Sequence, residues 1–278
     1  QVNNEGFEFS LNTVNIRNKN FTWSSTFGLS HNKNTIKHLY YRYEDVLNEA
    51  GEVVGSKEVD DVNRGWFVGK DISAIWDHEF IGIWQEDEAE EAAKYGQQPG
   101  DAKVRDVNGD YKITQEDKVF LGQETPKFRW SFRNEFILFR NWDISLNLYS
   151  QMGHKQSTTE YLNFFDNLGD YSNTYKREYW TPENKPNSYA RLKSTRPSNI
   201  NPKKVINKGF IRLENISVSY RVPQQFARKL MAKEISIYGT VRNVAVWAFD
   251  KEWDYWDPET KGLLPRTFTF GASITFIV

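Results

Sequence analysis

Apolar and polar residues alternate with a period of two over several stretches of about ten residues, and this pattern constrains the fold more than any other feature. In the last stretch, Phe, Ala, Ile and Val at even positions of 268–278 oppose Thr, Gly and Ser at odd positions of 267–275. Comparable stretches begin at Phe21, Phe128 and Trp142, and weaker ones lie near 5–16, 62–69, 72–84, 208–222 and 233–247. Successive side chains of a β-strand point to opposite faces, so an all-β, antiparallel fold of about eight strands is predicted.

The connections between these stretches alternate in length. Short turns are predicted near Arg17–Asn20, Gly69–Ile72, Phe139–Asn141 and Pro223–Ala232. Long connections are predicted at about 32–61, 85–126, 152–207 and 248–265. In an antiparallel sheet this alternation places all long loops at one end, which is typical of transmembrane β-barrels of the outer membrane. The strands are therefore predicted to form part of such a barrel, with long extracellular loops.

The composition agrees with a barrel wall. Mean hydropathy is −0.71, yet Phe 19, Tyr 14 and Trp 10 make aromatic residues 15% of the chain. A barrel combines a polar interior and polar loops with a lipid face banded by aromatic residues. The first residues lack the basic and apolar segments of a secretory signal. The chain is therefore predicted to be a mature fragment or a part of a longer polypeptide.

Several function classes are disfavoured. Lys+Arg 36 against Asp+Glu 37 gives a net charge of −1, which argues against a nucleic-acid partner. The sequence contains no Cys, which rules out disulfides, thiolate metal sites and cysteine nucleophiles. No GxSxG, HExxH or Gly-rich phosphate loop occurs. The chain is predicted not to be an enzyme.

A series of short motifs resembles the C-terminal part of the SusC/RagA family of TonB-dependent outer-membrane transporters from Bacteroidetes-type bacteria. In chain order they are Asn4-Glu-Gly-Phe-Glu-Phe9, Gly82-Ile-Trp84, Pro99-Gly-Asp101, Asp106-Val-Asn-Gly-Asp110, Gly122-Gln-Glu-Thr-Pro-Lys-Phe128, Tyr179-Trp-Thr-Pro-Glu-Asn184 with Arg191-Leu192, Phe210-Ile-Arg-Leu-Glu-Asn-Ile216 and Pro265-Arg-Thr-Phe-Thr-Phe-Gly271. Each motif alone is weak, but the ordered set covers nearly the whole chain and is specific.

The resemblance implies that the chain is roughly the last third of a barrel of about 22 strands. The plug and the TonB box that should precede it are absent from this chain. The implied function is TonB-dependent import of a large nutrient, an oligosaccharide or oligopeptide. The implied partners are a SusD-like surface lipoprotein, the TonB complex acting through the plug, and outer-membrane lipid. The location implied is the outer membrane of a Gram-negative bacterium, with the C-terminus periplasmic.

A calcium site is predicted in the loop that follows residue 105. Side chains or carbonyls at positions 1, 3, 5, 7 and 12 of an EF-hand-like loop would come from Asp106, Asn108, Asp110, Lys112 (by its carbonyl) and Asp117. Tyr111 replaces the usual Gly at position 6, and position 12 is Asp instead of Glu. The alternative is a metal-free turn held by Asx hydrogen bonds.

Aromatic residues in the predicted outer loops are candidates for substrate contact, because aromatic rings bind sugars and peptide side chains. They are Trp180, Trp253, Tyr255 and Trp256. Loop packing is the alternative for each. Nearby Trp247 is a candidate for an interfacial aromatic belt.

Two further sets of residues are assigned from strand alternation. Arg129, Arg133 and Glu135 share the polar face of one predicted strand and are expected to face the barrel lumen. The apolar face of the last strand is expected to act as a C-terminal assembly signal. It consists of Phe268, Phe270, Ile274, Phe276 and Val278.

Two other functions remain open on the sequence alone. The chain could be a structural or interaction subunit of a larger outer-membrane assembly, which predicts stable partners and no nutrient phenotype. Less well supported is a soluble, calcium-binding β-sandwich that binds glycans. That fold would bury its apolar strand faces and would be extracted without detergent.

Overall fold

The computed structural model describes residues 1–158, 178–253 and 256–276. These residues form two compact units, each considered by itself. The connection unit comprises Gln1–Val2, Thr35–Glu124 and Lys155–Ile206, and the sheet unit comprises Asn3–Asn34, Thr125–His154 and Asn207–Val278. No helix within the described ranges is both long enough and apolar enough to cross a membrane.

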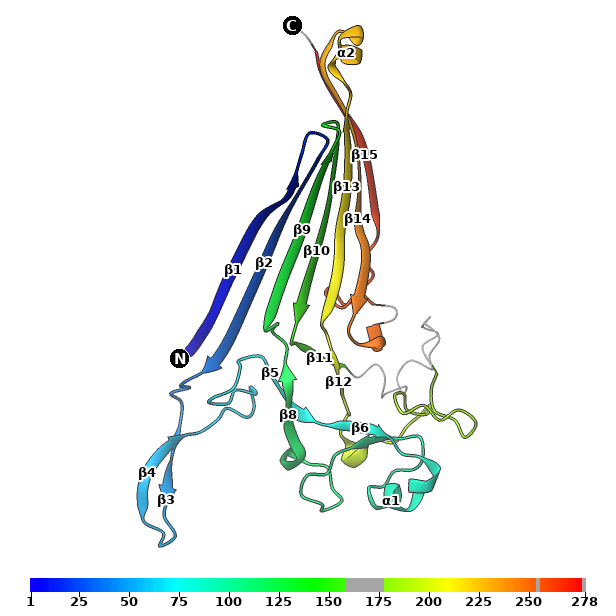
Figure 1. Ribbon diagram of the computed structural model, residues 1–278. Helices are drawn as coiled ribbons and strands as arrows, with labels where there is room; N and C mark the ends of the chain where they lie inside the picture. The colour runs from blue at the N-terminus through cyan, green and yellow to red at the C-terminus, as the bar shows by residue number, and fades with distance from the viewer. Residues whose placement is uncertain (159–177, 254–255, 277–278) are drawn as a thin grey trace. The chain divides into compact units, whose positions relative to one another are not determined.

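Seven long strands form the main sheet in the order β1-β2-β9-β10-β13-β14-β15 (Figure 1). Their bounds are β1 Val2–Arg17, β2 Phe21–Ile36, β9 Phe128–Leu138, β10 Trp142–Met152, β13 Phe210–Arg221, β14 Ala232–Ala248 and β15 Thr267–Phe276. Every pair from β2 to β15 is antiparallel. The predicted antiparallel, mostly β fold is therefore confirmed.

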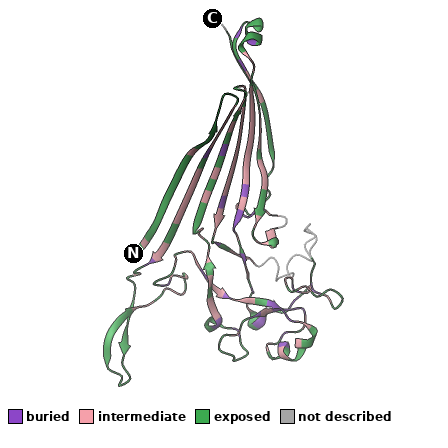
Figure 2. Ribbon diagram, viewed as in Figure 1, coloured by how far each residue is buried: buried purple, intermediate pink, exposed green. Residues whose placement is uncertain are grey.

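The register separates the sheet into two faces of opposite character. Ile144 of β10 lies opposite Phe136 of β9 and Val218 of β13. Its neighbour Ser145 lies opposite Glu135 and Ser217. We call these the apolar face and the polar face. Most residues of these strands are half-buried or exposed (Figure 2). Phe270 on the apolar face is 81% exposed.

The connections between neighbouring strands alternate in length, although the short turn predicted near Gly69–Ile72 lies inside one of the long connections. Residues 18–20, 139–141 and 222–231 form the short turns, and residues 37–127, 153–209 and 249–266 form the long connections. Because the strands are antiparallel, all three turns lie at one end of the sheet, which we call the short-turn end. The long connections all leave from the opposite end.

Two predicted strands do not belong to this sheet, so it has seven strands where about eight were expected. Residues 62–69 contain only an isolated bridge between Asp61 and Trp66. Residues 72–84 form β5 (Ala74–His78) and β6 (Phe80–Ile83), which pair with β8 (Lys118–Gln123) and β7 (Ala102–Val104). Ile75 and Ile83 are buried inside the connection unit, so their apolar pattern reflects a small local core. The segments about 32–61 and 85–126 are consequently parts of one connection.

The remaining elements are short. They are β3 Tyr43–Leu47, β4 Val53–Glu58, η1 Glu86–Glu88, α1 Ala89–Lys94, η2 Gln115–Asp117, β11 Lys155–Thr158, η3 Pro197–Asn199, β12 Lys204–Asn207, α2 Gln224–Ala227, η4 Arg228–Leu230 and η5 Lys251–Trp253. β3 pairs with β4, and β11 pairs with β12.

Candidate functional site

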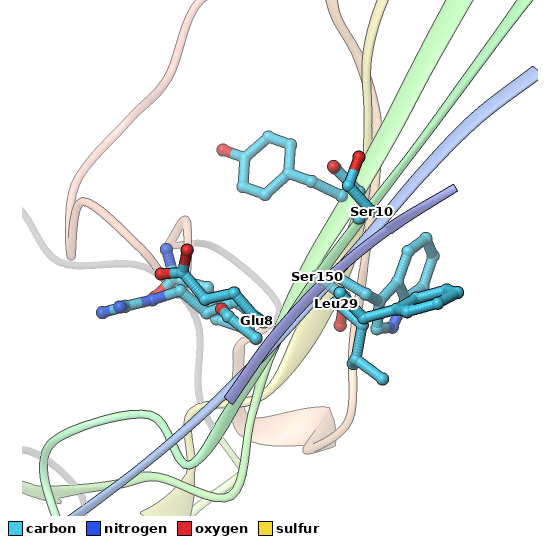
Figure 3. Close-up of a pocket in the computed structure, with 12 residues that line it drawn as sticks. Glu8, Ser10, Leu29 and Ser150 are labelled. Atoms are coloured by element: carbon cyan, nitrogen blue, oxygen red, sulfur yellow. The ribbon is translucent and has the colours of Figure 1, made fainter. Parts of the chain in front are cut away.

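A hollow of about 470 Å³ lies on the sheet unit where β1, β2, β9 and β10 run side by side (Figure 3). Its lining comes from both faces of the sheet, with Glu8, Ser10, Gly28, Ser30, Arg129, Ser131, Tyr149 and Gln151 on the polar face and Phe9, Leu29, Trp130 and Ser150 on the apolar face. Gly28 and the serines have little or no side chain and so leave space at this point. A Cβ added at Gly28 would already lie 3.0 Å from Ser131 Oγ. Hydroxyl, amide, carboxylate and guanidinium groups at its edge can hydrogen-bond a polar ligand.

The three residues predicted to face a lumen do share the polar face. Arg129 lies opposite Gln151, and Arg133 lies opposite Asn147. Arg133 forms an exposed ion pair with Glu135, with 2.6 Å between Nη2 and Oε1. An exposed pair contributes little to stability, so these charges mainly define the polarity of this face.

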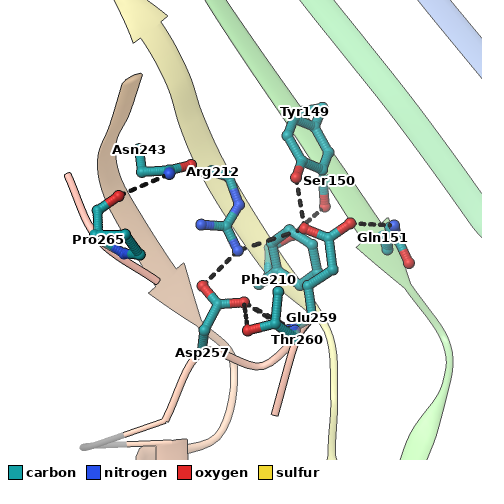
Figure 4. Close-up of polar contacts among 10 residues, drawn as sticks. All are labelled: Tyr149, Ser150, Gln151, Phe210, Arg212, Asn243, Asp257, Glu259, Thr260 and Pro265. Carbon is teal, nitrogen blue, oxygen red and sulfur yellow. Dashed lines mark hydrogen bonds and ion pairs between the residues drawn. The ribbon is translucent and has the colours of Figure 1, made fainter. Parts of the chain in front are cut away.

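A second group of polar contacts fixes the β14–β15 connection to the polar face of the sheet (Figure 4). Arg212 Nη2 of β13 lies 2.5 Å from Asp257 Oδ2 and 3.4 Å from Glu259 Oε2. Tyr149 Oη and Gln151 Nε2 of β10 donate to the two oxygens of Glu259, at 2.5 and 3.1 Å. Two neighbouring strands thus hold one connection.

The Asp257 carboxylate also shapes the connection itself. Its Oδ1 accepts hydrogen bonds from the backbone N–H groups of Glu259 and Thr260, at 3.0 and 3.1 Å. The backbone of Asp257 exchanges hydrogen bonds with Lys261 and Gly262. Arg212 and Asp257 are both buried, and Arg212 Nε has no partner within the described residues. The ion pair therefore depends on Nη2 and is sensitive to loss of either partner.

In the connection unit, three of the sequence motifs pack against one another. Asp101 is fully buried and accepts hydrogen bonds from Arg191 Nε and Thr195 N, both at 2.8 Å. Gly100 has φ +90°, and a Cβ there would lie 2.5 Å from the ring of Trp180. These motifs therefore act as a structural unit that holds distant parts of the connections together.

Trp180 is part of this packing and does not offer a free ring for substrate. It is buried, and its indole N–H donates to Gln85 Oε1 at 3.1 Å. The structure therefore supports loop packing over substrate contact at this position. Trp253 is partly exposed, with its Nε1 donating to the Asn207 carbonyl at 2.7 Å, and Trp256 is also partly exposed. Tyr255 lies outside the described residues.

The predicted calcium loop is closed by hydrogen bonds from its own backbone. Asp106 accepts from the N–H groups of Gly109 and Tyr111, at 2.7 and 2.9 Å. Buried Asp117 accepts from Val107 and Thr114, at 2.9 and 2.7 Å. Asn108 Oδ1 accepts from the N–H of Asp110, and Asp110 Oδ1 accepts from the N–H of Lys112.

These contacts match the metal-free Asx arrangement. Tyr111 adopts φ 62°, so it takes the backbone conformation for which a Gly is usual. No three acidic or histidine side chains in the described ranges come together as a metal group. Calcium at Asp106, Asn108, Asp110, Lys112 and Asp117 stays a prediction.

The last strand carries the apolar side chains proposed for the assembly signal on one exposed face. They are Phe268, Phe270, Ile274 and Phe276. Val278 lies outside the described residues. Their role in assembly stays a prediction.

Sequence reasoning missed the pairing of Arg212 with Asp257 and the central position of Asp101. Strand alternation could have placed Arg212 on the polar face, and Asp257-Pro-Glu-Thr260 is a recognisable turn sequence. Nothing in the sequence joins two residues that are 45 positions apart.

Comparisons with known proteins fit this fold and these motifs. No family model matches the chain. The chain is similar over nearly its whole length to a segment of TonB-dependent receptors, which confirms the predicted resemblance. TonB-dependent receptor P26 of Formosa agariphila is 29% identical over 296 residues, and receptor P3 of the same organism is 24% identical over 295 residues. Both alignments cover 99% of this chain and 29% of the relative.

Solved structures give the same fold. The RagAB peptide importer in its "open-open" state matches with a TM-score of 0.66 at 16% identity over 99% of this chain. The RagAB peptide transporter matches with a TM-score of 0.67 at 15% identity over 98%. In both cases the chain spans 29% of the matched chain's length. These relatives are named as receptors, an importer and a transporter, and none of them is named as an enzyme.

Proposed function

We propose that the chain is part of the wall of a transmembrane β-barrel in a TonB-dependent outer-membrane importer. In this proposal the apolar face contacts lipid and the polar face lines the lumen. The observation that carries it is the two-faced sheet, whose apolar side chains stay exposed along long strands. From Trp142 to Ser150, which lies opposite Trp130, β10 rises roughly 26 Å. An apolar band of about 25 Å is typical of such barrels.

Aromatic residues at both ends of the apolar face support this orientation. At the short-turn end, Trp142 and Tyr220 have ring centroids 4.6 Å apart, and Phe21 and Trp23 both stack on Phe136. Trp130 and Trp247 lie nearer the other end. Aromatic belts of this kind occur at the two membrane–water interfaces.

A polar cluster on the apolar face satisfies its own hydrogen bonds. Asn134 Oδ1 accepts from Trp23 Nε1 at 2.9 Å and from Ser25 Oγ at 2.8 Å. Asn134 and Ser25 are buried, although their neighbours on the same face are apolar. Polar groups are tolerated in lipid when they are paired in this way, so the cluster is compatible with a lipid-facing sheet.

The transported molecule in this proposal is a large polar nutrient, an oligopeptide or an oligosaccharide. The hydroxyl, amide and charged groups around the hollow beside Arg129 suit either class. The similar RagAB complex is named a peptide importer, which favours the oligopeptide. The rest of the protein would supply the plug and the coupling to TonB. The long connections would be extracellular, would meet a SusD-like surface lipoprotein, and the C-terminus would be periplasmic.

The alternative roles have weaker support. A structural or interaction subunit of an outer-membrane assembly would use the same two-faced sheet and differs only in lacking transport. A soluble β-sandwich needs a second sheet over the apolar face. In the described part of the sheet unit, Phe270 is instead 81% exposed and no second sheet is formed.

Cysteine substitutions at adjacent residues of β10 test the membrane orientation, because this sequence has no cysteine of its own. Ser145→Cys should react with a water-soluble maleimide in native outer membranes, and Ile144→Cys should not. Unfolding in denaturant should make both react equally, which controls for intrinsic reactivity. Equal labelling of both variants in intact membranes would contradict the proposal.

Uptake by a strain that lacks the full-length protein tests the transport role. We expect loss of uptake of labelled oligopeptides too large for general porins, with uptake of free amino acids unchanged. Oligosaccharides of similar size serve as the second substrate class. Unchanged uptake of both classes, together with intact membrane insertion, would instead support the structural role.

A further inference from the structure

The short-turn end of the sheet unit is strongly basic, although the whole chain has a net charge of −1. We define the short-turn rim as residues 17–20, 139–143 and 221–234. Its basic residues are Arg17, Lys19, Arg140, Arg221, Arg228, Lys229 and Lys233, and its acidic residues are Asp143 and Glu234. The rim therefore carries a net charge of +5.

The two acidic side chains of the rim are both engaged by one arginine. Arg221 lies 3.6 Å from Asp143 and 3.3 Å from Glu234. The other six basic side chains form no ion pair with any described residue. No carboxylate of the described residues therefore neutralises their positive charge.

Exposed apolar side chains lie among these charges. Phe226, Leu230 and Met231 belong to the turn between β13 and β14 and are 51%, 66% and 76% exposed. α2 of this turn lies at the tip of the β13–β14 hairpin (Figure 1). Lys229 Nζ lies 5.7 Å from the centre of the Phe226 ring, so cationic and apolar groups alternate over one small surface.

The turn packs over the apolar face of the sheet. Ile235 and Ile237 both belong to that face, opposite Ile274 and Ala272. Ile237 is 54% exposed, but Ile235 is only 9% exposed because it packs in a cluster with Ala227, Ala232 and Val222. The cluster fixes the turn on the side of the sheet that faces lipid in the proposed function.

We infer that the short-turn rim binds anionic phospholipid headgroups of the adjacent leaflet. Phe226, Leu230 and Met231 would enter the boundary between headgroups and acyl chains, and the basic side chains would contact lipid phosphates. This combination of an apolar surface with surrounding Lys and Arg is the general signature of interfacial binding to anionic lipid. The inference rests on the proposed membrane-spanning role of the sheet.

A probe at Met231 tests the depth of the turn. The full-length protein, in a background free of other cysteines, would carry Met231→Cys labelled with a nitroxide. It would be placed in nanodiscs of phosphatidylcholine with about one third phosphatidylglycerol. We expect the label to be accessible to oxygen and protected from a water-soluble nickel reagent, whereas a label at Asn18→Cys in the β1–β2 turn should remain accessible to nickel.

Charge variants test the choice of lipid. The rim variant combines Arg228→Gln, Lys229→Gln and Lys233→Gln. The matched control removes the same charge from exposed residues elsewhere, with Lys37→Gln, Lys193→Gln and Lys251→Gln. Native mass spectrometry would count the phosphatidylglycerol molecules retained by each protein. We expect a loss of at least about fivefold in the rim variant, the factor for one charge near an anionic surface, and little change in the control.

The outcomes separate this inference from the proposed function. If the protein inserts into the bilayer but the label at Met231 is accessible to nickel, the inference is overturned. The rim would then be occupied by a partner in the aqueous phase. Insertion with equal phosphatidylglycerol retention by the rim variant and the wild type would overturn it as well. Failure of the wild type to insert into any bilayer would overturn the proposed function, and the inference with it.

Discussion

Arg212 of β13 and Asp257 of the β14–β15 connection form a buried ion pair, with 2.5 Å between Nη2 and Oδ2. The pair fixes a connection, far away in sequence, to the polar face of the sheet, and Glu259 strengthens the attachment through Tyr149 and Gln151. In the proposed barrel this connection would narrow the lumen. Its position would then affect which molecules pass.

Loss of Arg212 should release this connection. In Arg212→Met the buried Asp257 carboxylate would lose its ion-pair partner and keep only hydrogen bonds, which costs about 3–5 kcal/mol. We expect faster hydrogen exchange of the backbone amides of Glu259, Thr260 and Lys261, because they bond to Asp257. The double variant Arg212→Met with Asp257→Leu removes both charges and should recover part of the protection. Protection equal to the wild type in the single variant would contradict this account.

Gly100 should be intolerant of a side chain for two separable reasons. Gly100→Ala introduces a left-handed residue and a Cβ that meets the Trp180 ring. Gly109→Ala is a matched control, because its φ is +75° but no heavy atom lies within 4 Å of the added Cβ. We expect a cost of about 1–2 kcal/mol in the control and about 1–3 kcal/mol more at Gly100. Hydrogen exchange at Arg191, whose N–H donates to the Gly100 carbonyl, measures the cost at Gly100, and exchange at Tyr111, whose N–H donates to Asp106, measures the control.

Asp117→Asn should destabilise its loop with or without calcium. Burial favours the neutral form, but hydrogen bonds from Thr114 and Val107 outweigh it and lower the pKa of Asp117. The amide would present an N–H₂ group to a backbone N–H donor, and we expect a loss of about 1.5–3 kcal/mol in local stability. Exposed Asp110→Asn is the milder control, because Asp110 accepts one backbone bond through a single oxygen, which the amide oxygen of Asn can replace. The readout is hydrogen exchange at Val107.

The same experiment tests the calcium prediction. If the ion binds, adding calcium should slow exchange throughout 106–117 in the wild type, and a chelator should reverse the effect. Both variants should weaken that response. An identical exchange profile with calcium and with chelator would rule out calcium binding at this loop.

His154 should make stability fall in mild acid. Burial, with the charges of Lys208 and Arg129, lowers the pKa of His154 to about 4, against about 6.5 for the unfolded chain. Below pH 6.5 the unfolded state binds a proton that the folded state does not, so folding free energy is lost until about pH 4. The contribution at pH 5 is at most about 2 kcal/mol.

Calorimetry of the full-length protein in detergent at pH 7 and pH 5 measures this effect. His154→Gln should show a smaller fall in Tm between the two pH values than the wild type, because Gln does not titrate. His31→Gln is the control, since the His31 side chain is more exposed than that of His154. A fall in Tm that is the same in all three proteins would exclude His154 as its source.

Most of the sheet followed from the sequence. Seven alternating stretches became β1, β2, β9, β10, β13, β14 and β15, because period-two patterning is a local property that places each side chain on one of two faces. The alternation of short and long connections followed as well. The motifs that resemble SusC/RagA proteins pointed correctly to TonB-dependent receptors.

The sequence alone could not decide which alternating stretches join the sheet. Residues 72–84 alternate convincingly, yet Ile75 and Ile83 are buried within the connection unit and pair only with β8 and β7. Trp180 looked like an exposed loop aromatic, but Gly100 lets its ring pack against the backbone. Local patterns carry no information about such distant neighbours.

The sequence by itself therefore determined the two-faced strands, their turns and the class of protein that they resemble. Only the tertiary structure decided the pairing of Arg212 with Asp257, the burial of Asp101 and Trp180, and the position of the β13–β14 turn over Ile235. The physical reason is the separation along the chain over which each effect acts. Alternation and turn propensity act between residues close in the chain, whereas burial and ion pairing depend on segments that only the folded chain brings together.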